Sequence, residues 1–107
     1  MILCQFEDIC KKYGLEICRS NFDKDADCWY NNSLICYFIG AQYTAYVVKD
    51  LHLMGRKYNK FIYGDNKSCM YKTPEKFELK LQEVIKKWKQ LEIEIANNNL
   101  EKDFDND

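Results

Sequence analysis

Glycine, proline and histidine are scarce in this chain of 107 residues, which contains four, one and one of them. The glycines stand apart at positions 14, 40, 55 and 64, which excludes a glycine-rich loop that holds phosphate. The single histidine, His52, excludes the paired histidines of metalloprotease motifs and leaves a cysteine nucleophile only one candidate base. No apolar run reaches the ~20 residues that span a bilayer. We therefore expect a protein without enzymatic activity, without a resident cofactor and without a membrane segment.

Cysteine is well represented, with six residues at positions 4, 10, 18, 28, 36 and 69. None of them forms a CxxC pair, so the spacing of a zinc site is missing. The first residues lead into a polar helical pattern instead of an apolar leader, which favours a reducing compartment. We expect reduced thiols that pack as small hydrophobic side chains in a cytoplasmic protein, with no metal site.

Both ends of the chain have helical patterns. Leu3, Phe6 and Ile9 recur on one helical stripe near the start, and Gly14 is placed to end that helix. Thr73 and Pro74 are typical of a helix start, and the pattern that follows predicts a second helix to about residue 96. The acidic residues 98–107 are predicted to form a mobile tail after a single domain over 1–97.

The middle of the chain has strand patterns. Asn31-Asn32 can supply the tight turn of a hairpin, and the strand 33–39 after it is apolar on both faces, which predicts a central position. Residues 42–50 alternate as a strand, and residues 51–60 are interpreted as a basic connector. A second short hairpin is expected around Asp65-Asn66. The fold class predicted is α+β, with an antiparallel sheet of three to five strands and both helices on one face.

The second helix is predicted to be longer than the sheet that would cover its apolar side. A helix over 74–96 is roughly 35 Å long at ~1.5 Å per residue, whereas typical strands span only about 17–20 Å. Its later apolar residues Trp88, Leu91 and Ile95 are therefore predicted to project past the sheet and to bind a partner protein or a second copy of the chain. In the alternative, the first helix covers this stripe.

Basic residues concentrate between positions 51 and 76, although the net charge of the chain is only -1. Partner-binding residues are therefore predicted in this stretch as well, namely Arg56, Lys57, Tyr58 and Lys60. The order of helix, strands and helix is also that of a double-stranded-RNA-binding domain, which gives an alternative function in RNA binding. Glutamates at the start of the second helix disfavour direct contact with nucleic acid.

Composition suggests the kind of function. Lysine, asparagine, isoleucine and tyrosine are favoured, a bias typical of AT-rich sources such as low-GC bacteria and their phages. Small proteins of such mobile elements commonly bind and block a larger host machine. The sequence therefore leads us to expect a protein-binding inhibitor, for example an anti-CRISPR or similar counter-defence protein, with a larger host protein or nucleoprotein complex as its partner.

Overall fold

The computed structural model describes residues 1–20, 24–56 and 59–105, with side chains for these ranges except residues 59 and 98–105. The elements follow one another along the chain as α1 (Leu3–Lys12), β1 (Glu16–Arg19), β2 (Ala26–Tyr30), β3 (Ser33–Ile39), a 3-10 turn η1 (Gly40–Gln42), β4 (Thr44–Val48), β5 (Leu51–Arg56), β6 (Asn59–Gly64), β7 (Ser68–Tyr71) and α2 (Pro74–Asp105). The mixed α+β fold predicted from the sequence is confirmed.

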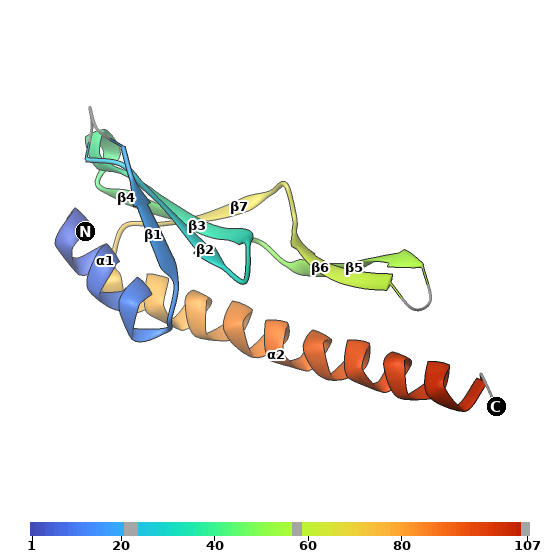
Figure 1. The fold of residues 1–107 in the computed structure, drawn as a ribbon. Coiled ribbons are helices and arrows are strands. Elements are labelled where there is room, and N and C mark those ends of the chain that lie inside the picture. Colours follow the sequence, from blue (N-terminus) through green and yellow to red (C-terminus); the bar gives the residue numbers. More distant parts are fainter. Residues whose placement is uncertain (21–23, 57–58, 106–107) are drawn as a thin grey trace.

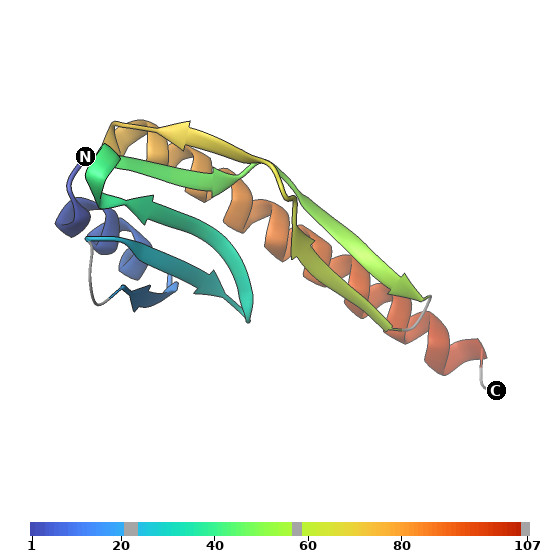
Figure 2. The ribbon, with the colours of Figure 1, turned by 90° about the horizontal axis from the view of Figure 1, so that it is seen from above.

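The strands form two sheets. The larger has five antiparallel strands in the order β1-β2-β3-β4-β7, and β5 and β6 pair only with each other. Figure 1 shows α1 and α2 on the same side of the five-stranded sheet. The hairpin β5–β6 extends beyond that sheet and lies over the second half of α2 (Figure 2). Both helices therefore cover one face, as the sequence predicts.

Aromatic rings close the core between the helices and the sheet. Phe6 of α1 stacks on Phe38 of β3 at 5.3 Å and on Phe77 of α2 at 5.1 Å between ring centroids. All three rings are fully or almost fully buried. Gly14 follows α1 with a φ of 77°, a left-handed conformation that most other residues adopt at a cost. The first helix thus ends where the sequence predicts.

The turn between β2 and β3 fits its asparagines. Asn31 and Asn32 have φ values of 48° and 67°, the left-handed region that asparagine tolerates better than most residues. The β3 strand that follows is the middle strand of the five, and it contains a register shift against β2 that leaves both Ile35 and Cys36 buried. The predicted hairpin and the predicted central strand are both confirmed.

Two predictions about the later strands are wrong. Residues 51–56 form the strand β5 instead of a connector, and β6 pairs with β5 instead of forming a hairpin with β7. β7 pairs with β4 and aligns Cys69 with Val47, so it extends the main sheet. Apolar residues of β5 are buried by packing on α2. This burial stabilises a strand although the sequence of the segment alternates only irregularly between apolar and polar residues.

The helix α2 is longer than predicted, because it runs through Asn97 and ends at Asp105. Asparagine is only a moderately poor helix former, and no glycine or proline follows Pro74 to stop the helix. The division of the chain at residue 97 stays a prediction. No helix in the described ranges is both long enough and apolar enough to span a membrane.

Candidate functional site

The predicted apolar stripe on α2 is not a free surface. Trp88 and Leu91 are only 5% and 7% exposed, and Ile95 is partly buried against the same core. The expectation that these residues project uncovered is wrong, because Tyr30 packs on Trp88 and the hairpin β5–β6 lies along this half of the helix (Figure 1). A homodimer or a partner contact through this stripe would first require the hairpin to leave it.

The predicted basic residues lie at the far end of the hairpin. Arg56 is exposed at the end of β5, and Lys60 is half-buried near the start of β6. Lys57 and Tyr58 lie outside the described residues. The structure thus brings Arg56 and Lys60 to one tip, next to a surface that the sequence did not single out.

That surface is the side of the hairpin turned away from α2, which we call the outer hairpin face and define as His52, Met54, Phe61 and Tyr63. These residues are directly opposite one another in the register, His52 with Tyr63 and Met54 with Phe61. Met54 and Phe61 are 55% and 53% exposed, although both side chains are apolar. The other side of the hairpin is apolar too, since Leu51 and Ile62 are buried.

Polar groups surround this face. The His52 Nε2 atom lies 3.6 Å from Asp65 Oδ2, and its ring lies 5.4 Å from that of Tyr63. The pKa of Asp65 is lowered, first by the backbone N–H of Lys67, which donates to the carboxylate, and also by His52. His52 therefore contacts Asp65 and Tyr63 on the hairpin, whereas Cys36 is buried in the core.

The face of the large sheet opposite the helices carries a row of side chains in register. Tyr37 and Tyr46 stack at 4.9 Å between centroids with planes 10° apart, and Met70 follows Tyr46 with 58% exposure. Asp27 continues the row on the other side of Tyr37 and is exposed. We call Asp27, Tyr37, Tyr46 and Met70 the open sheet face.

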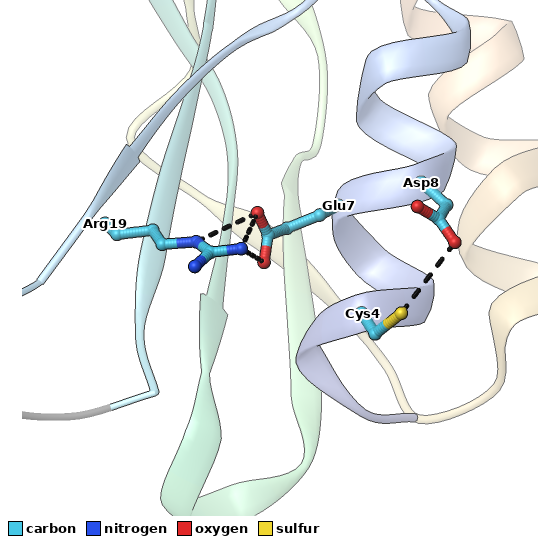
Figure 3. Close-up of polar contacts among 4 residues, drawn as sticks. All are labelled: Cys4, Glu7, Asp8 and Arg19. Carbon is cyan, nitrogen blue, oxygen red and sulfur yellow. Dashed lines mark hydrogen bonds and ion pairs between the residues drawn. The ribbon is translucent and has the colours of Figure 1, made fainter.

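A third feature is a cavity of about 480 Å³ beside α1, lined by residues that include Glu7, Asp8, Arg19 and Phe38. Figure 3 shows the two-pronged contact of Arg19 with the Glu7 carboxylate: Nε donates to Oε2 at 3.0 Å, and a terminal nitrogen donates to Oε1 at 2.5 Å. The Glu7 side chain is only 6% exposed, so the guanidinium compensates a buried charge. Arg19 donates to both oxygens of the carboxylate and so links β1 to α1.

Sequence reasoning missed the pair, although one signal was present. Glu7 lies four residues after Leu3 and three before Cys10, which puts a carboxylate on the apolar stripe of the helix. A charge at such a position requires a partner. The partner Arg19 comes from β1, and nothing in the local sequence pairs it with Glu7.

Cysteines gather in the core beneath α1. All six are free, and the Sγ atoms of Cys10, Cys28 and Cys36 lie within 4.8 Å of one another. The Sγ atoms of Cys10 and Cys36 are 3.8 Å apart. The nearby thiols of Cys10 and Cys36 lower the pKa of Cys28, whereas burial raises the pKa of Cys36. A search by sequence spacing could not find this group, because α1, β2 and β3 each contribute one residue.

Comparisons with known proteins give no relative for this arrangement. No family model, no curated protein and no solved structure matches the chain.

Proposed function

We propose that this chain is a protein-binding module without enzymatic activity and that the outer hairpin face is its contact surface. The observation that supports the proposal is the apolar character of both sides of the hairpin β5–β6. Leu51 and Ile62 are buried toward α2, whereas Met54 and Phe61 are more than half exposed on the opposite side.

An antiparallel ribbon that packs on one side commonly has polar residues on the other. Here the outward positions are methionine, phenylalanine, tyrosine and histidine, residue types suited to contact surfaces. Arg56 and Lys60 stand at the tip of the same hairpin. The matching partner surface is therefore an apolar groove with an acidic rim, into which the hairpin inserts.

The narrower proposal is that the partner belongs to a larger host machine, which the protein inhibits. It is supported by the small size and the composition of the chain. Identification of the partner tests it directly, because a captured metabolic enzyme or structural protein would contradict the inhibitor role while leaving the binding surface intact.

The test compares matched variants as baits in affinity purification from host lysate, followed by mass spectrometry. Met54→Ser with Phe61→Ser removes the centre of the outer hairpin face. Leu79→Ser with Ile93→Ser removes two apolar residues that are 66% and 61% exposed on α2, which makes it the control. We expect the hairpin variant to lose a protein that the wild type and the control both retain. Equal capture by all three baits would contradict the proposal.

Binding to RNA is the second candidate, and the stacked rings of Tyr37 and Tyr46 favour it. Aromatic rings on the surface of a sheet can stack on bases, and both of these rings are partly exposed. Asp27 is exposed and lies opposite Tyr37 in the register, so it brings negative charge beside the rings, which opposes the approach of phosphate. Fluorescence anisotropy with single-stranded and duplex RNA at two salt concentrations decides this. Salt-sensitive binding that Tyr37→Ala with Tyr46→Ala abolishes would establish the RNA function.

A further inference from the structure

Three buried sulfur atoms meet in the core from three separate elements. Cys28 and Cys36 are opposite each other on β2 and β3, and Cys10 reaches them from α1. The residues are 0%, 1% and 0% exposed in that order. The other cysteines lie apart from this group: Cys4 and Cys18 are exposed, and Cys69 is partly exposed.

The distances suit a single ion between the sulfurs. A metal–sulfur bond is about 2.3 Å long, so three sulfurs in a plane around one ion lie about 4 Å apart. The Sγ atoms of Cys10 and Cys36 are already 3.8 Å apart, and no pair in the group exceeds 4.8 Å. Small side-chain rotations would therefore close the group around an ion.

The number of donors restricts the kind of ion. Among the described residues, no histidine, aspartate, glutamate or further cysteine joins this group as a fourth ligand. The nearby Glu7 carboxylate is held by Arg19. Structural zinc requires four ligands, whereas thiolates alone select soft ions. We propose that Cys10, Cys28 and Cys36 form a binding site for a thiophilic ion that is satisfied by three sulfur donors, either trivalent arsenic or Cu(I).

The two ions differ in charge balance. Arsenous acid, As(OH)₃, reacts with three thiols to give As(SR)₃ and three water molecules. Three As–O and three S–H bonds break, three As–S bonds form, and each thiol proton leaves with a hydroxide as water. No electron is transferred, and the product is neutral. Cu⁺ instead displaces the protons and leaves a complex with a charge of minus two when all three sulfurs are thiolates. A neutral product suits a dry core better, because a buried net charge is costly.

Access to the site should involve α1, because that helix supplies Cys10 and packs on the face of the sheet that carries the other two sulfurs. Arg19 ties α1 to β1 through Glu7, and Glu78 of α2 holds its other end through Lys12 and Tyr13. The ion can enter only when α1 shifts, so binding should be slow in the native protein and faster in mild denaturant.

The test uses the reduced full-length protein without oxygen. The protein is incubated with arsenite, with Cu(I) or with Zn(II) and then alkylated in mild denaturant, beside a sample without ion, and the alkylated positions are mapped by mass spectrometry. We expect arsenite or Cu(I) to protect Cys10, Cys28 and Cys36 while Cys4, Cys18 and Cys69 react. Protection of the exposed cysteines instead, or of none, would overturn the proposal. Zn(II) bound through these sulfurs and a fourth ligand would overturn it equally.

A variant series measures the number of donors. In a background in which Cys4, Cys18 and Cys69 are replaced by serine, X-ray absorption should give three sulfurs per bound ion. The further change Cys36→Ser should weaken binding by more than the roughly 10–100-fold that loss of a supporting residue costs at a metal site. If Cys36→Ser does not fold, the alkylation map of the wild type still decides, because it needs no variant. Three-sulfur binding of Cu(I) without arsenite binding would support the site and assign it to the monovalent ion.

Discussion

The indole ring of Trp88 lies edge to face against the ring of Tyr30, with 5.2 Å between their centroids and planes at 90°. The indole N–H of Trp88 donates to the Glu92 carboxylate, which also accepts from Asn31 at 3.2 Å. The tip of the β2–β3 hairpin and the middle of α2 are thus joined by an aromatic pair and by a shared carboxylate. Trp88 acts in the core, and its contribution is measurable.

Trp88→Ala should lower the free energy of unfolding by about 3–5 kcal/mol, because it opens a cavity in a packed core. Chemical denaturation followed by circular dichroism measures the change. Ile93→Ala on the exposed side of the same helix is the control and should alter stability by no more than ~0.5 kcal/mol. Equal effects of the two substitutions would mean that Trp88 is not packed in the core in solution.

Arg19→Ala should destabilise the protein by about 1–3 kcal/mol, because it leaves the Glu7 carboxylate buried without a charged donor. The Arg19 side chain is 63% exposed, so solvent reduces the effect below that of a fully buried pair. Glu7→Gln in the Arg19→Ala background should recover part of the loss, since a neutral amide is cheaper to bury. No recovery in the double variant would show that the charge of Glu7 is not what Arg19 compensates.

Gly40→Ala should cost roughly 1–3 kcal/mol, because the added Cβ would lie 2.6 Å from the Lys24 carbonyl oxygen and 2.7 Å from the Lys24 Cβ. Backbone atoms cannot rotate away as a long side chain can. Gly14→Ala is the contrast, because its Cβ meets nothing within 4 Å and only its φ of 77° is unfavourable. The Gly14 variant should lose about 1 kcal/mol in the same denaturation assay. A Gly40 variant as stable as the wild type would contradict the close approach of these two segments.

The contact between Glu78 and α1 should make the stability of the protein depend on pH in the acidic range. Lys12 Nζ lies 2.7 Å and Tyr13 Oη 2.9 Å from the Glu78 carboxylate, and they lower its pKa, Lys12 first. A carboxylate with a lowered pKa contributes fully above the ordinary value of 4.5, and its contribution is lost as pH falls through the lowered value. The melting temperature of the wild type should therefore decrease more steeply below pH 4.5 than that of Glu78→Gln. Parallel curves would contradict this link.

Local patterns predicted the parts of the fold that local chemistry decides. Pro74 begins α2, Gly14 ends α1, and Asn31-Asn32 form the β2–β3 turn, because each of these residues favours its own backbone conformation. The pairing of β4 with β7 across an inserted hairpin could not be predicted in the same way. Both strands have suitable patterns, and only the packing of β5 and β6 on α2 decides which edges meet.

The candidate sites were less predictable than the fold. The length of the helix relative to a single strand pointed to Trp88 as a contact residue, but the pattern of residues 51–60 indicated a connector and not the strand β5, which packs on the same helix. The outer hairpin face and the three sulfurs both depend on register between distant segments, such as Cys28 opposite Cys36. A periodic pattern gives the face of one element, whereas a site requires the relative placement of several.

The hairpin β5–β6 leaves the main sheet after Val48 and returns at Ser68, and β4 and β7 pair directly despite this excursion. The five strands therefore do not depend on how long the hairpin is. The hairpin and the second half of α2 do depend on each other, because each covers the apolar side of the other. Insertions and deletions in these two segments should consequently occur together, in matched lengths, while the first half of the molecule keeps its dimensions.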